Sequence, residues 1–180
     1  MKLVPLVTSL PPKTRRPAVS PQVLGVTQFP ETSEASIEIN APIDVVFEFV
    51  TDLTRMGEWS PECYAVAWED GSEGADLGAH FRGFNRVDEY EWDVPGEVTE
   101  FVKNRTFEFL VPRGSMLPTT WRFDFVAKDD RTSVRESFHA PMLNLEGSPS
   151  NFEGRFEMLH EGIVATLANI KSAAESLSAS

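Results

Sequence analysis

The chain has 180 residues, 41% of them apolar, and a net charge of −12 from 16 basic and 28 acidic side chains. This composition suits one globular domain, whereas the charge would repel nucleic acid and anionic membrane surfaces. A single cysteine, Cys63, excludes an intrachain disulfide and a multi-cysteine metal site. Because no stretch reaches the ~20 apolar residues of a membrane span and prolines interrupt the apolar N-terminal run, we expect a cytoplasmic protein.

Residues 1–33 are predicted to be a proline-rich extension, because they hold six of the thirteen prolines and show little periodicity. The folded domain is expected to span 34–177. Its first strand is indicated by apolar and polar residues that alternate from Ala35 to Asn40. Pro42 suits the first turn of a helix, and we predict two short helices after it, the second around 54–57.

From Cys63 onward, alternation predicts six further strands joined by short turns. The inward positions of these strands begin with Tyr64, Val66 and Trp68 in the first of them and end with Val134, Glu136 and Phe138 in the last. Pro95-Gly96 should introduce a β-bulge, because proline cannot donate to the strand ladder. His80 and His139 share the parity of charged residues and should face water.

The longest periodic segment predicts a helix over 150–177, with apolar residues three or four positions apart. Ser150 and Glu153 form a capping-box pattern at its start. Gly154 and Gly162 each cost this helix about 1 kcal/mol relative to alanine. Either close packing or room for a ligand would explain them, and the pattern does not distinguish the two.

Consecutive antiparallel strands usually pair with their neighbours, so this order predicts an α+β fold. One curved seven-stranded antiparallel sheet should wrap around the long C-terminal helix, with the two short helices after the first strand. Such an arrangement leaves a cavity, for which we expect a volume of several hundred cubic ångströms and mainly apolar walls. The residues predicted to line it are Trp59, Tyr64, Trp68, Phe81, Trp92, Phe107, Phe109, Trp121, Phe123, Phe138, Phe156, Leu159 and Ile163.

The same element order, with Ala41-Pro42 through Asp52, the segment Trp59-Ser60-Pro61-Glu62-Cys63 and the segment from Gly78 to Arg86, resembles the polyketide cyclase/dehydrase branch of the START-like superfamily. The resemblance covers about 34–177 and implies the helix-grip fold. The family includes aromatase/cyclases that act on poly-β-ketone chains, lipid and hormone carriers, and many bacterial proteins. Its usual chemistry uses no metal or organic cofactor, and it has no universal catalytic motif.

A small hydrophobic molecule, polyketide- or lipid-like, is therefore the expected partner. Two functions remain open: an enzyme that guides cyclisation or dehydration of a reactive chain, and a carrier or sensor that binds its ligand unchanged. A third is a protein-interaction module that uses the acidic surface. The pattern does not indicate the oligomeric state.

Three polar residues are candidates for chemistry. Glu136 lies among inward hydrophobes, where lost solvation should raise its pKa toward the range of a general acid or base. Asn85 could hydrogen-bond a carbonyl or a developing enolate, and His160, about 60° from the centre of the helix stripe, could reach the cavity rim. The structural alternative is that Glu136 binds Arg82, Arg122 or the backbone. No metal site is predicted, since the histidines lack ligand spacing.

Overall fold

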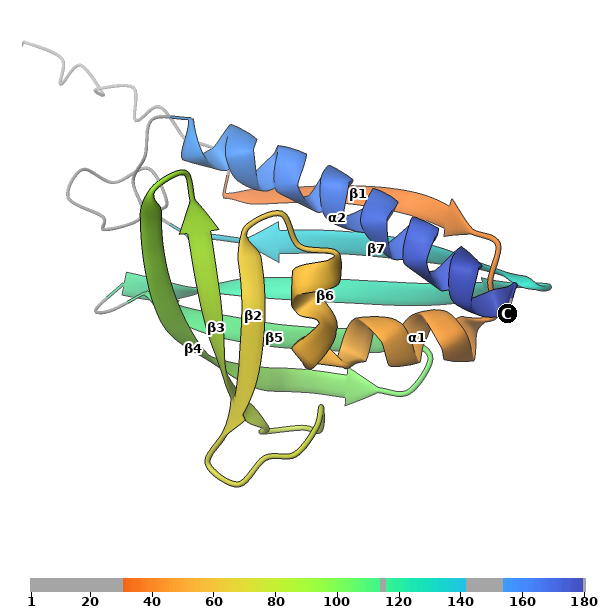
Figure 1. Cartoon of the computed structure of the whole chain (residues 1–180), viewed down its shortest axis with the longest axis horizontal. Coiled ribbons are helices and arrows are strands. Elements are labelled where there is room, and N and C mark those ends of the chain that lie inside the picture. The colour runs from red at the N-terminus through yellow and green to blue at the C-terminus, as the bar shows by residue number, and fades with distance from the viewer. Residues whose placement is uncertain (1–30, 114–115, 142–153, 180) are drawn as a thin grey trace, which may run out of the picture.

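The computed structural model describes residues 31–113, 116–141 and 154–179, and these form an α+β fold around one sheet (Figure 1). The elements are β1 (Thr32–Ile39), α1 (Ile43–Thr51), the 3₁₀-helix η1 (Leu53–Glu58), β2 (Cys63–Glu69), β3 (His80–Val87), β4 (Tyr90–Val102), β5 (Thr106–Arg113), β6 (Met116–Lys128), β7 (Arg131–His139) and α2 (Arg155–Ser178). The predicted fold class, with two short helices after the first strand, is confirmed.

The seven strands are ordered β1-β7-β6-β5-β4-β3-β2, and each neighbouring pair is antiparallel. Every strand after β2 therefore pairs with the one before it, while β1 joins the far edge. The strands β2 to β4 cross the direction of β1, β6 and β7, so the sheet is strongly curved, and α2 lies across its open side next to β1 (Figure 1). No helix among the described residues is long and apolar enough to cross a membrane.

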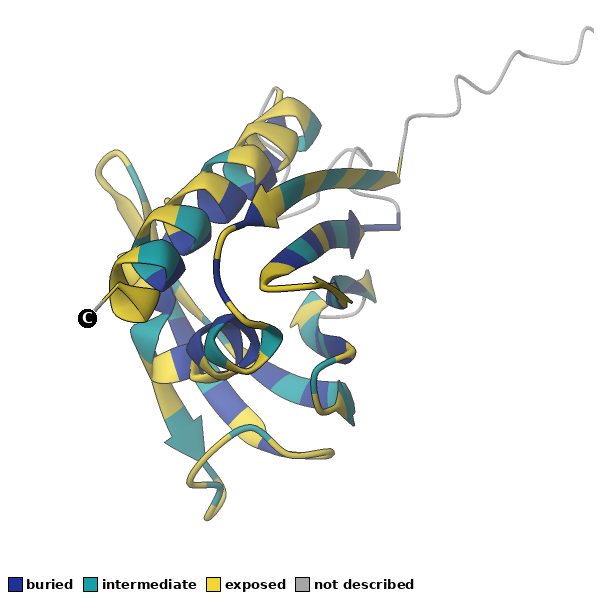
Figure 2. Cartoon of the chain, turned by 90° about the vertical axis from the view of Figure 1, so that its right-hand side faces the viewer, coloured by how far each residue is buried: buried dark blue, intermediate teal, exposed yellow. Residues whose placement is uncertain are grey.

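The core is closely packed where α1 and the C-terminal half of α2 meet the sheet. The α1 side chains Phe47 and Val50 are buried together with Leu167 and Ile170 from the C-terminal half of α2. Phe47 lies edge-on to the ring of Phe125, with centroids 5.1 Å apart. Figure 2 shows the buried side of α2 turned toward the sheet. The C-terminal half of α2 is thus held by ordinary close packing.

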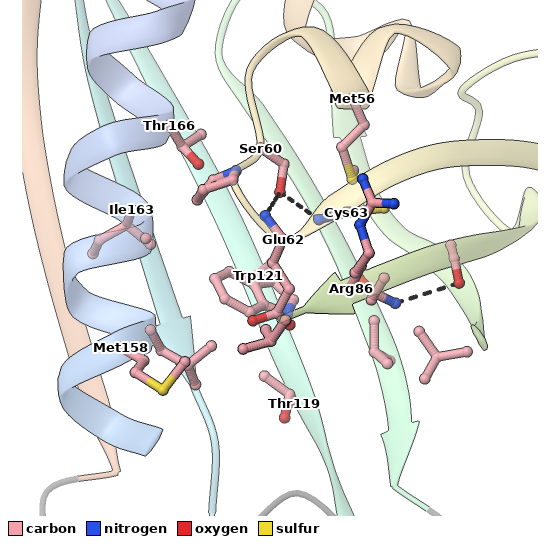
Figure 3. A pocket seen from close by; sticks show the side chains of 18 of the residues that line it. Met56, Ser60, Glu62, Cys63, Arg86, Thr119, Trp121, Met158, Ile163 and Thr166 are labelled. Carbon is pink, nitrogen blue, oxygen red and sulfur yellow. Dashed lines mark hydrogen bonds between the residues drawn. The ribbon is translucent and has the colours of Figure 1, made fainter. Parts of the chain in front are cut away.

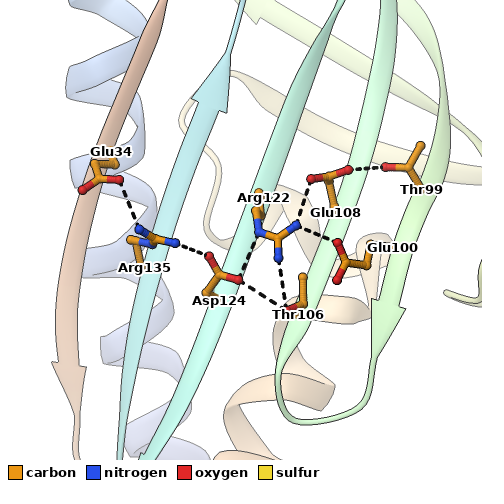
Figure 4. A network of polar contacts seen from close by, with 8 residues as sticks. All are labelled: Glu34, Thr99, Glu100, Thr106, Glu108, Arg122, Asp124 and Arg135. Carbon is orange, nitrogen blue, oxygen red and sulfur yellow. Dashed lines mark hydrogen bonds and ion pairs between the residues drawn. The ribbon is translucent and has the colours of Figure 1, made fainter.

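The convex face carries a polar network across five strands (Figure 4), formed by Glu34, Arg135, Asp124, Arg122, Glu108 and Glu100. Arg122 at its centre contacts three carboxylates at 2.7–3.1 Å. Arg82 is likewise paired, with Glu69 at 2.7 Å and Asp93 at 2.5 Å. Since successive side chains of a strand point to opposite faces, neither arginine reaches the inner face that holds Glu136.

The predicted bulge at Pro95-Gly96 is wrong. The register of β3 and β4 runs without a break through Arg82 opposite Pro95 and Phe81 opposite Gly96. Pairing of β4 with β5 begins only at Glu97, so Pro95 has a strand neighbour on one side and its missing N–H costs no bond to β5. The register shift of β4 lies beyond it, between Val98 and Glu100.

The described start of the long helix also differs from the prediction. The helix α2 begins at Arg155, and its N-cap is Gly154, whose φ of 75° is left-handed and suits glycine. The predicted capping box of Ser150 and Glu153 lies outside the described residues. Residues 1–30 of the predicted extension also lie outside the described residues. The prediction ends this extension at residue 33, whereas β1 already begins at Thr32.

Gly96 provides a test of the packing of the inner face. A Cβ atom at this position would overlap the ring of Phe81, so we expect Gly96→Ala to lower the free energy of unfolding by about 1–3 kcal/mol. Gly74→Ala is the matched control, because no atom lies within 4 Å of its Cβ position. Urea unfolding measures both. Equal stabilities of the two variants would contradict this account of Gly96.

Candidate ligand-binding cavity

A cavity of about 790 Å³ lies between the curved sheet and the N-terminal half of α2, bordered by the segment that joins η1 to β2 (Figure 3). Its volume agrees with the expected several hundred cubic ångströms. Figure 3 shows Met158, Ile163 and Thr166 on the helix side of the cavity and Trp121 on the sheet side. The predicted residues that line it are Trp59, Phe81, Asn85, Trp92, Phe109, Trp121, Phe123, Glu136, Leu159 and Ile163.

Five of the predicted apolar residues lie elsewhere. A register shift between Cys63 and Ala65 turns Tyr64 to the outer face, where it is 44% exposed. Trp68 packs edge-on against Phe81, and Phe107 is fully buried behind the lining rings. Phe138 and Phe156 pack on each other, with centroids 5.6 Å apart. Alternation thus identifies the inner face but not which inner residues border empty space.

His160 also lies outside the cavity lining. Its Nδ1 atom is 2.7 Å from the hydroxyl oxygen of Ser33, and the residue is exposed. The flank of α2 that carries His160 faces β1, whereas the opposite flank, with Met158, Glu161 and Gly162, faces the cavity. The apolar stripe of α2 has two flanks that the sequence pattern does not distinguish. Only the position of β1 decides which flank borders the cavity.

Glu136 is the buried carboxyl of the cavity, with only 3% of its surface exposed. Its neighbours across the strands are Phe123 and Ala35. Its Oε2 atom is buried and has no hydrogen-bond partner among the described residues, so the pairing with Arg82 or Arg122 that the sequence left open does not occur. Desolvation raises the pKa of Glu136 well above its ordinary value of 4.5.

Two other polar side chains in the lining, those of Asn85 and Cys63, make only long hydrogen bonds. The side-chain amide of Asn85 donates one long bond of 3.4 Å to the carbonyl of Gly83. The thiol of Cys63 donates to the carbonyl of Ala65 at 3.4 Å, and burial raises its pKa to about 11, so it is not a thiolate nucleophile near neutral pH. In the described part of the chain, no three His, Cys, Asp or Glu residues come together to hold a metal.

The sequence prediction missed Arg155 and Glu62. The Arg155 guanidinium binds both carboxylate oxygens of Glu62, at 2.5 and 2.7 Å, and lies 6.0 Å from the ring centre of Trp92. Its side chain is 7% exposed and lines the cavity. This pair joins the start of α2 to the segment before β2. Glu62 belongs to a segment that carries the family resemblance. Arg155 gave no such sign, because a charged residue in a helical pattern does not by itself indicate burial.

Comparison with known proteins finds sequences that resemble most of this chain. The family model described as polyketide cyclase / dehydrase and lipid transport matches residues 30–175. Penitrem biosynthesis cluster 1 protein I of Penicillium ochrochloron is 30% identical over 124 residues, which cover 65% of this chain and 80% of that protein.

Solved structures share the fold. The solution structure of a polyketide-cyclase-like protein of Corynebacterium glutamicum has 32% identity and a TM-score of 0.55, covering 80% of this chain and 91% of that one. The di-domain ARO/CYC protein of the steffimycin biosynthetic pathway has a TM-score of 0.62 at 10% identity, covering 83% of this chain and 52% of that one. At that identity the likeness shows the fold alone.

The buried carboxyl predicts a characteristic dependence of stability on pH. Because the pKa of Glu136 is higher in the folded than in the unfolded chain, the folded state binds more protons and loses stability as pH rises from about 4.5 through the folded pKa. Each unit between the two pKa values contributes about 1.4 kcal/mol.

Glu136→Gln removes this titration. Its melting temperature, relative to that of the wild type, is therefore expected to be higher at pH 8 than at pH 5. Thermal unfolding by circular dichroism at both pH values measures the difference. A stability difference that does not change with pH would contradict the raised pKa.

Proposed function

Because the chain belongs to the polyketide cyclase/dehydrase and lipid transport family, we propose that its cavity binds a small, mainly apolar molecule of polyketide- or lipid-like character. The observation that carries the proposal is a cavity of about 790 Å³, lined by aromatic rings, that contains the unpaired carboxyl of Glu136. Cavities of ~300–1,000 Å³ with apolar walls and few polar groups are typical of small-molecule sites.

The polar atoms of the lining indicate that the ligand carries oxygen. Trp59 Nε1, Glu136 Oε2 and Arg155 Nε are buried without a hydrogen-bond partner among the described residues, and all three side chains line the cavity. Leaving such a group unpaired costs about 1–3 kcal/mol. The indole and guanidinium N–H groups only donate, and a neutral carboxyl can also donate. A carbonyl or ether oxygen would accept from any of them.

Catalysis is a second candidate function, and the raised pKa of Glu136 favours it. A carboxyl that exchanges its proton nearer neutrality suits general acid and base catalysis. In a ring closure of a poly-β-ketone, Glu136 would take a proton from the carbon that attacks and give it to the oxygen of the attacked carbonyl, which becomes a hydroxyl. Transfer of a second proton from the same carbon to that hydroxyl would release water and leave a carbon–carbon double bond. The amide of Asn85 would donate a hydrogen bond to the enolate oxygen. If Glu136 acts first as the base, turnover rises with pH through its pKa.

Binding is tested with a ligand pair that differs in one oxygen. We expect the wild type to bind 2-acetylnaphthalene about tenfold more tightly than 2-ethylnaphthalene, which corresponds to one net hydrogen bond of ~1.4 kcal/mol. Glu136→Leu should reduce this preference, while Glu136→Gln, which still donates, should retain most of it. Isothermal titration calorimetry gives the affinities. No binding of either compound would contradict the proposed function.

Turnover is tested separately with 1-phenylhexane-1,3,5-trione. Bond formation between its terminal methyl carbon and the phenyl ketone carbon, with loss of one water, gives 5-phenylresorcinol. If Glu136 is catalytic, Glu136→Gln should keep the affinity for the trione but lose about 10²-fold or more in product formation. Chromatography of the product measures this. A carrier would give no product above the uncatalysed rate with either protein.

A further inference from the structure

Two glycines inside regular elements line the cavity: Gly83 in β3 and Gly162 in α2. Glycine in the middle of a strand or helix is destabilising relative to alanine, because it loses more backbone freedom on folding. Such positions need an explanation, which is either an unusual backbone conformation, a close approach by another atom, or a need for empty space.

Most of the other described glycines are explained by the first two reasons. Gly71, Gly78 and Gly154 have positive φ angles of 75–81°, which favour glycine. A Cβ at Gly57 would overlap the carbonyl oxygen of Tyr64, and one at Gly96 would overlap the ring of Phe81. Only glycine fits these places without a shift of the backbone or of a packed ring.

Neither reason applies to Gly83 or Gly162, and neither has a positive φ. A Cβ at Gly162 would meet only Pro61 Cγ, at 3.9 Å, and one at Gly83 would lie 3.5 Å from Cys63 Sγ, an ordinary van der Waals contact. Alanine would therefore fit both positions in the empty protein. Of the two explanations that the sequence left open for Gly162, close packing is excluded.

We propose that Gly83 and Gly162 are kept without side chains to make room for the ligand, and that they limit the width of the molecule that the cavity accepts. One glycine belongs to the sheet and the other to the helix, and their nearest neighbours, Cys63 and Pro61, lie on one short segment. The two positions therefore bound the same part of the cavity. The inference rests on the proposed function, because only a bound molecule gives this space a use.

Substitution at Gly162 separates stability from binding. Gly162→Ala should raise the melting temperature by about 2–4 °C, because alanine is the better helix former. Gly162→Leu should weaken binding of 1-acetylpyrene, which has four fused rings, about tenfold or more, and that of the narrower 2-acetylnaphthalene much less. Gly162→Ala and Gly83→Ala should cause smaller losses of affinity, again larger for 1-acetylpyrene than for 2-acetylnaphthalene. The control is Ser172→Ala on the exposed side of α2, which should leave both affinities unchanged.

Calorimetry and thermal unfolding of the full chain decide between the outcomes. A lower melting temperature of Gly162→Ala would show that packing requires the glycine and would overturn the inference. Unchanged affinity of Gly162→Leu for both probes would overturn it as well, while the proposed function would stand because both probes still bind. If the wild type bound neither 1-acetylpyrene nor 2-acetylnaphthalene, the proposed function and this inference would both be overturned.

Discussion

The structure depends on how one long helix closes a curved sheet. The C-terminal half of α2 packs fully, with Leu167, Ile170 and Ala174 buried against the sheet and α1. Its N-terminal half borders the cavity instead and is connected to the segment before β2 by the ion pair of Arg155 with Glu62. A helix held by packing at one end and by a partly buried, bidentate ion pair at the other can border a cavity that it does not fill.

The two faces of the sheet differ in whether their charged side chains are paired. On the convex face, arginines and carboxylates alternate in a partly exposed network in which every charge has a partner of opposite sign. On the concave face, Glu136 stands among apolar side chains without a counter-charge from the described residues. Since β7 places Arg135 outside and Glu136 inside, this difference follows from the pleat of one strand. A buried polar group without a partner destabilises the fold, and such groups are common at functional sites.

Glu136 and Gly162 are alike in their effect on stability and in their position. Each lowers stability in the empty protein, and each borders the cavity. Leucine in place of the carboxyl and alanine in place of the glycine would fit ordinary rules of packing and helix propensity. Two departures from these rules that meet in one cavity support a role for the cavity better than its volume does, because volume alone can result from imperfect packing.

The sequence by itself determined the element order, the antiparallel topology and the inner face of most strands, because period-two alternation and short turns leave few other ways to bury the apolar side chains. It also placed Asn85 and Glu136 inside. It could not show that a register shift turns Tyr64 outward, that pairing with β5 ends before Pro95, or that β1 covers the flank of α2 with His160. These depend on which strand lies next to which residue, and local patterns carry no such information. Only the tertiary structure decided which inner residues border empty space, because that depends on atoms from three or more elements at once.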